Sequence, residues 1–156
     1  MDTLNSLLLF IHSWLRWIIL ILLLVGIFNS LSKMQRPLSN VAKKMNLWLM
    51  IAAHITLLIG LYQYFFGPIG FVFFRTMGVA EVMKNSVYRF WAVEHIIGMI
   101  IAIILITITR GIAKKDIEPA RKNKKLLVLY IFAIIIIIAS IPWPGRFGDL
   151  PLFRGL

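Results

Sequence analysis

The chain has 156 residues, of which 60% are hydrophobic, with a mean hydropathy of +0.88 and a net charge of +11. This apolar content is concentrated in long runs and excludes an ordinary soluble domain, which is closer to half apolar. The sequence contains no cysteine, which excludes disulfides, thiolate-bound iron–sulfur clusters and a covalently attached c-type haem.

Four apolar runs follow one another, and each has the length of a helix that crosses a hydrocarbon core of about 30 Å. None alternates polar and apolar residues with period two, as the strands of a membrane barrel do. Because a helix satisfies its own backbone in lipid, we expect an all-α integral membrane protein. The expected architecture is a four-helix up-down bundle that forms one domain over residues 1–156. The predicted spans are Leu7–Phe28, Leu47–Phe66, Phe90–Ile108 and Leu126–Trp143.

The segments around these runs carry further signals. We expect the first run to remain as a span, because Asp2 stands where a signal peptide has basic residues and no small-x-small cleavage site follows. Gly67 and Pro68 predict the end of the second helix. Within the outer loop, residues 67–89, the stretch 76–86 is predicted to form a short interfacial helix. The outer tail, residues 144–156, is rich in proline, glycine and aromatic residues, and we expect no helix there.

Basic residues gather in the two remaining loops, residues 29–46 and 109–125. Four of them in the first loop and seven in the second make eleven of the 17 in the chain. The positive-inside rule places both loops in the cytoplasm and both termini outside, in the inner membrane of a bacterium. This placement of charge favours contact with the anionic head groups of the bilayer, so we expect no nucleic-acid partner.

Three histidines lie inside the apolar runs, where lipid disfavours ionisable groups. His12 and His95 each stand five residues into a run that starts outside, which puts both roughly 8 Å below the outer edge. His54 lies about 18 Å down on the antiparallel second span. The first and third helices of an up-down bundle can face each other across its centre. His12 and His95 are therefore candidate ligands of one haem iron, and His54 is the least certain metal ligand.

Four charged residues are candidates to hold or tune that cofactor. Arg16 lies one turn from His12, and Glu94 lies inside the third span, so an Arg16–Glu94 pair would reduce the cost of both charges. Glu94 is alternatively a hydrogen-bond acceptor for a histidine N–H. Arg89 and Arg146 lie at the outer end, where they are placed to bind haem propionates.

Each of these residues also has a purely structural interpretation. A buried histidine commonly donates a hydrogen bond between membrane helices, and an arginine–glutamate pair can serve only to neutralise its members. Zinc would need three or four converging ligands, and no G-x-S-x-G, H-E-x-x-H or Walker motif occurs. We therefore expect an electron-transfer or accessory subunit rather than a stand-alone enzyme.

Four segments together resemble a group of short bacterial four-span proteins catalogued as cytochrome b-like. The segments are HSWLRW at 12–17, AHITLLIGLYQY at 53–64, YRFWAVEH at 88–95 and IPWPGRFG at 141–148. The resemblance runs over nearly the whole chain and implies a b-type haem held between histidines, for which His12, His54 and His95 are the positions present. The chain lacks the fourth histidine of two-haem cytochromes, so the resemblance implies one haem.

The leading prediction is a membrane cytochrome, or cytochrome-like subunit, that carries one haem b near the outer face and transfers single electrons, from a quinol to a partner outside. Two alternatives stay open. One is a cofactor-free accessory subunit of a larger membrane complex. The other is a quinone- or lipid-binding membrane protein that uses Arg16 and Glu94.

Overall fold

The computed structural model describes residues 2–146, and within that range the chain is helical without strands, which confirms the all-α prediction. A five-residue π-helix, η1 (Phe90–Glu94), joins α4 to α5, so that Ser86–Lys114 forms one continuous helix. The remaining elements are α1 (Asp2–Ser32), α2 (Asn40–Phe66), α3 (Val72–Lys84), α4 (Ser86–Arg89), α5 (His95–Lys114) and α6 (Pro119–Ser140).

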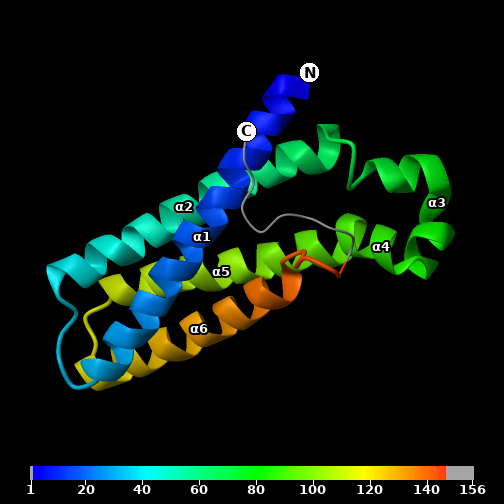
Figure 1. Cartoon of the computed structure of the whole chain (residues 1–156). Coiled ribbons are helices and arrows are strands. Elements are labelled where there is room, and N and C mark those ends of the chain that lie inside the picture. Colours follow the sequence, from blue (N-terminus) through cyan, green and yellow to red (C-terminus); the bar gives the residue numbers. More distant parts are fainter. Residues whose placement is uncertain (1, 147–156) are drawn as a thin grey trace.

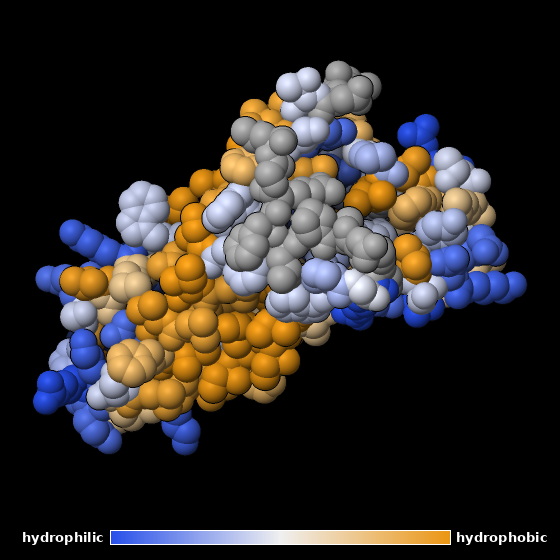
Figure 2. Space-filling view, viewed as in Figure 1, coloured by the Kyte–Doolittle hydropathy of each residue, from blue (hydrophilic) through white to orange (hydrophobic). Residues whose placement is uncertain are grey.

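Four of these helices, α1, α2, the continuous α4–η1–α5 helix and α6, are long and apolar enough to cross a membrane. Their outward faces carry large apolar side chains, and Phe28 and Leu58 are each more than two-thirds exposed. Figure 2 shows this surface as an orange area between blue ends. A surface of this kind needs lipid around it, since a soluble monomer rarely exposes large continuous apolar patches. The chain is a multi-pass membrane protein.

The four long helices pack around a narrow core. The most extensive contact joins α5 to α6, while α1 packs on α2 and α6, and α2 also packs on α5. Figure 1 shows α2, α5 and α6 running in similar directions and α1 crossing them at an angle, with α3 beyond the far end of α2 and α5. The core contains Leu23, Ala53, Ile106 and Ala133, none of which has any exposed surface. Alanine at two of these positions lets the helix backbones approach closely, as is usual in membranes.

The helices extend beyond the predicted spans wherever the flanking residues favour helix. The second helix begins at Asn40 rather than at Leu47, because the Ser39 hydroxyl caps it by accepting a hydrogen bond from the Ala42 N–H. Lysine and arginine, which flank the runs, are good helix formers. Hydropathy therefore marks the part of a helix that faces lipid and not the end of the helix. The C-terminal end of α6 is at Ser140, because Ile141 precedes a proline and adopts extended geometry.

Between α2 and α4, the structure has the helix break and the short helix that the sequence predicts, but with a different start for the short helix. The predicted break at Gly67 and Pro68 is confirmed, because α2 ends at Phe66. The short helix expected over residues 76–86 is present as α3, but it begins four residues earlier, at Val72. Gly78 interrupts α3 with a φ of 79°, a left-handed conformation that glycine adopts without strain. Most of the predicted outer tail, residues 147–156, lies outside the described residues.

Two asparagines hold the basic end of the molecule, where α1 leads into α2 and α5 leads into α6. The Nδ2 atom of Asn46 donates at 2.8 Å to both Thr109 Oγ1 and Tyr130 Oη, which ties α2 to α5 and α6. The Nδ2 atom of Asn123 lies within 3.0 Å of three carbonyl oxygens just after α1. Those carbonyls follow the end of the helix, where backbone acceptors need partners from elsewhere.

Candidate functional site

The backbone just before His95 departs from α-helical geometry. The His95 N–H bonds to the carbonyl of Phe90, five residues earlier, which closes the π-turn of η1. Within the same turn the Ala92 carbonyl accepts a hydrogen bond from the Tyr64 hydroxyl of α2 at 3.0 Å. A π-turn inside an α-helix shifts the direction of the following side chains and frequently occurs at functional sites. Here it sets the direction of His95 at the first residue of α5.

The His95 ring is fixed by the end of α6. Its Nδ1 atom lies 2.7 Å from the Ser140 carbonyl oxygen. A carbonyl can only accept, so Nδ1 carries the hydrogen and Nε2 keeps its lone pair. That carbonyl is available because α6 ends at Ser140 and its last carbonyls have no partner within the helix. Gly98 permits the approach, since a Cβ there would overlap Ser140 Oγ.

His12 reaches the same region from α1. A Cβ built at Gly60 of α2 would lie 3.2 Å from His12 Cε1, so a glycine at that position leaves room for the imidazole. The Nδ1 atom of His12 is buried and makes no hydrogen bond of good geometry, although the backbone of Thr56 faces the ring. The imidazoles of His12 and His95 are close enough to interact electrostatically. One nitrogen of this pair is thus buried without a well-formed hydrogen bond.

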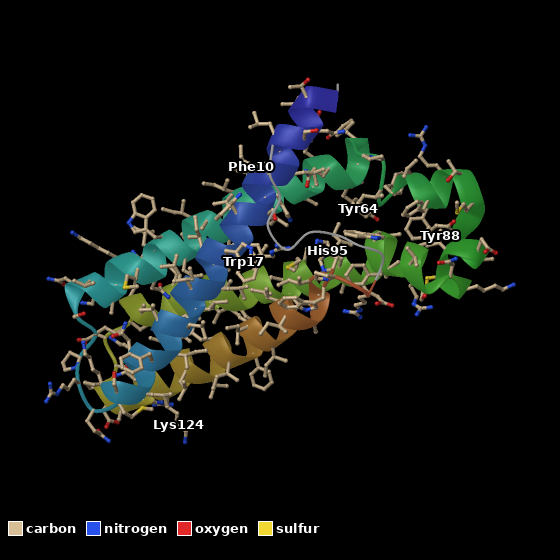
Figure 3. All side chains as sticks on the ribbon, in the orientation of Figure 1. Phe10, Trp17, Tyr64, Tyr88, His95 and Lys124 are labelled. Atoms are coloured by element: carbon tan, nitrogen blue, oxygen red, sulfur yellow. The ribbon has the colours of Figure 1, made fainter. Side chains whose placement is uncertain are left out.

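Arg16 lies near both histidines. It follows His12 by one turn of α1, and its charge interacts electrostatically with both imidazoles. Its Nη2 atom lies 3.3 Å from the Ser13 hydroxyl, and its Cζ atom is 5.3 Å from the centre of the Trp17 ring. The last distance is within range of a cation–π interaction. Figure 3 labels Trp17 on α1 and His95 at the start of α5, the two helices that supply the site.

The predicted Arg16–Glu94 pair is wrong, because Glu94 pairs with Arg89. The Arg89 Nε atom lies 2.7 Å from Glu94 Oε1, and Arg89 Nη1 donates to the Met83 carbonyl at 2.9 Å. The two charged side chains are 35% and 41% exposed. They lie five residues apart, a spacing that the wider π-turn brings onto one side of the helix. Glu94 is therefore neutralised locally, at the surface.

Arg146 contacts Phe90, one of the two aromatic side chains next to His95. Its Nη1 atom donates to the Ala139 carbonyl at 2.8 Å, and its Cζ atom lies 5.0 Å from the centre of the Phe90 ring. The rings of Phe90 and Trp91 are each 5.9 Å from the His95 ring, centre to centre. Arg146 thus reaches the histidine region through Phe90.

His54 does not join this site. It lies on an exposed face of α2, and its Nδ1 atom bonds at 2.8 Å to the carbonyl of Met50 in its own helix. No group of three or more metal-ligating side chains occurs among the residues that the structure describes. The site therefore offers two imidazoles, which suits the two axial positions of a haem iron better than zinc, with its three or four protein ligands.

Three features of the site escape prediction from the sequence: the π-turn, the Ser140 carbonyl and Gly60. A signal for Ser140 was present, since Pro142 predicts that α6 ends just before it and leaves free carbonyls. The π-turn and Gly60 have no comparable signal, because neither changes the pattern of hydropathy. No family model, curated protein or solved structure matches the chain.

Proposed function

We propose that the protein is a small membrane cytochrome, or a cytochrome-like subunit, that binds one b-type haem between His12 and His95 and relays single electrons. Its helices form an up-down four-helix bundle in the inner membrane of a bacterium, with both termini outside. The observation that carries the proposal is the approach of two imidazoles, from α1 and α5, beside the half-buried Arg16.

The hydrogen bond of His95 favours a role as a metal ligand. Its Nδ1–H donates to the Ser140 carbonyl, which fixes the ring and leaves Nε2 available. Histidines that ligate metals almost always donate their other N–H to a carbonyl, a carboxylate or water, which fixes the tautomer and increases the basicity of the ligating nitrogen. The carbonyl comes from a helix end, so it would hold the ring in place with or without an iron atom.

The buried nitrogen of His12 supports the same proposal. A polar atom buried without a hydrogen bond costs on the order of 1–3 kcal/mol, and Nδ1 of His12 is such an atom. Haem, when bound, supplies an iron centre that takes up and releases one electron. A shift of the His12 side chain toward that iron would satisfy a ring nitrogen that the protein itself leaves without a good partner. The glycine at position 60 gives the ring room for such a shift.

The charged residues have separate roles in this proposal. Arg16 lies nearest the histidines and would raise the reduction potential, since a positive charge favours the reduced iron. Arg146 would hold a propionate by charge-assisted hydrogen bonds at the aromatic side of the site. Arg89 and Glu94 neutralise each other, so Arg89 is less available for a propionate. We propose a quinol as the electron donor and a redox protein outside as the acceptor.

The test is a reduced-minus-oxidised absorption spectrum of the purified protein, produced with an adequate haem supply. The wild type should show the sharp α-band of a low-spin b-type haem, which His12→Ala and His95→Ala should each abolish. His54→Ala is the matched control and should keep the band, because His54 faces outward and bonds within its own helix. A flat spectrum from folded wild type would contradict the proposal, and so would a band that survives in both ligand variants.

The second candidate is a cofactor-free accessory subunit of a larger membrane complex. The hydrogen bond from His95 to Ser140 favours it, since that bond also joins α5 to α6 without any cofactor. A colourless protein that comigrates with larger membrane proteins in mild detergent would support this candidate. The remaining alternative, quinone binding at an Arg16–Glu94 pair, loses its premise because Glu94 pairs with Arg89.

A further inference from the structure

A cavity of about 340 Å³ opens at the basic end of the molecule. It lies at the C-terminal end of α5, whereas His95 is the first residue of that helix. Five cationic side chains and one carboxylate line it, so its net charge is +4. The charged lining residues are Lys43, Arg110, Lys114, Lys115, Asp116 and Lys122. This end of the structure, with Lys124 labelled on it in Figure 3, adjoins the apolar surface seen in Figure 2.

Four of the five cations come from three helices that end or begin near this cavity, and Lys115 directly follows α5. Lys43 lies in the first turns of α2, Arg110 and Lys114 lie in the last turns of α5, and Lys122 lies at the start of α6. Within residues 2–146 the one ion pair is Arg89–Glu94, so none of these cations forms an ion pair with an acidic side chain in that range, and Asp116 offsets only one of the five charges. Like charges gathered around one hollow repel each other, and an anion in the hollow would remove that repulsion.

Arg110 distinguishes this cavity from a merely basic surface. Its Nη1 atom donates to the Lys43 carbonyl at 3.1 Å, which fixes the guanidinium between α5 and α2. Its Nε atom is buried and has no hydrogen-bond partner. A guanidinium has several N–H donors in a planar fork, a shape that suits the oxygens of a phosphate. One donor of that fork is thus buried without an acceptor, on a side chain that lines a cavity of net positive charge.

We propose that this cavity binds a phosphate group. The apolar surface of the protein gives way to hydrophilic residues at its ends, and basic pockets between membrane helices suit the head group of an anionic phospholipid. Inorganic phosphate has the same chemistry and is the other source. The remaining lysines of this end, such as Lys44 and Lys124, are exposed and do not line the cavity, so they attract anions without enclosing one.

The test measures binding by native mass spectrometry of the full chain in mild detergent. The probes are phosphatidylglycerol, phosphatidylcholine and inorganic phosphate. The double variant Arg110→Gln/Lys114→Gln removes two charges from the cavity, and Lys44→Gln/Lys124→Gln removes two charges from the exposed surface of the same end. Because each nearby cation contributes about fivefold to the affinity for an anionic lipid, the cavity variant should bind phosphatidylglycerol on the order of 20-fold more weakly.

The control variant should retain binding within about threefold, because exposed charges are screened by salt. Saturable binding of inorganic phosphate with the same dependence on Arg110 and Lys114 would also support the proposal and would identify the free ion as the source. Equal losses in both double variants would overturn it, and so would binding of phosphatidylcholine as strong as that of phosphatidylglycerol. If the cavity variant does not fold, Lys43→Gln/Lys122→Gln gives the same comparison from two other helices.

Discussion

The asparagines near the basic end and His12 at the histidine end differ in how far the protein itself satisfies their polar atoms. At the basic end, the Asn46 and Asn123 amides donate to side chains and to carbonyls that the helices leave free. The Oδ1 atom of Asn46 lacks a protein partner, and Asn46 is one of the residues that line a cavity of about 20 Å³, which has room for one water. At the histidine end, by contrast, a ring nitrogen of His12 is buried against apolar helices and Gly60.

This contrast separates a structural polar network from a candidate binding site. The side chains of Asn46, Thr109 and Tyr130 are hydrogen-bonded to one another. Apart from one water, this network needs no ligand to complete its hydrogen bonds. His95 has one nitrogen fixed by Ser140 and one left available, and His12 has no hydrogen bond of good geometry at Nδ1. We therefore expect variants of the Asn46 network to change stability without changing haem binding, and variants at the histidine end to change cofactor binding as well.

The largest effect is expected for Gly98→Ala. The added Cβ would overlap Ser140 Oγ and lie 3.1 Å from Ser140 Cβ, so Ser140 must shift, which costs about 1–3 kcal/mol of stability and displaces the carbonyl that holds His95. Both the unfolding free energy and the haem band should fall. Gly111→Ala is the matched control on the same helix, because nothing lies within 4 Å of its added Cβ. Equal effects of the two substitutions would show that α5 and α6 do not need a glycine at position 98.

Asn46→Ala should lower stability without affecting the haem spectrum. It removes the donor of two hydrogen bonds, and such bonds between membrane helices contribute roughly 0.6 kcal/mol each. Unfolding measured for Asn46→Ala, for Thr109→Val and for the double variant would give their coupling energy. A weakened haem band in Asn46→Ala, at unchanged haem supply, would mean that the two ends are not independent.

Arg16→Gln should lower the reduction potential of the haem on the order of 50 mV, because it removes a positive charge near both imidazoles. Arg16→Lys keeps the charge and should restore most of the potential. The matched control is Arg89→Gln/Glu94→Gln, which removes a neutral pair and leaves the net charge unchanged. A redox titration of the α-band measures all three variants. An unchanged potential in Arg16→Gln would place Arg16 outside the field of the iron.

The fold was predictable from the sequence to the extent that lipid dictates it. Long apolar runs must be helical in a membrane, and the Gly67–Pro68 pair must end a helix, so the four long helices and the end of α2 follow directly. Counting residues from the outer edge also placed His12 and His95 at one depth, and the structure brings them within electrostatic range. This inference needed only the helical rise and the direction of each span.

The details of the site were not predictable, because they depend on single-residue changes of register. The π-turn before His95 shifts one residue within a helix that stays equally apolar, so it leaves no trace in hydropathy. That shift places Glu94 beside Arg89, whereas a regular α-helix allowed the expected pair with Arg16. Asn46 and Asn123 likewise stand at the ends of apolar runs, where an asparagine in the sequence is indistinguishable from an ordinary polar flank.

The smallest effect is expected for the Arg89–Glu94 pair, and it tests where the surface of the site lies. Exposed ion pairs contribute at most about 1 kcal/mol, and both of these side chains are more than a third exposed, so a double-mutant cycle should give a coupling of about 0.5 kcal/mol that shrinks in salt. A coupling above about 1.5 kcal/mol that resists salt would indicate a desolvated pair. Glu94 would then belong to the interior with the histidines. The Arg89–Glu94 pair could then no longer be treated as a neutral surface pair that is separate from the charge of Arg16.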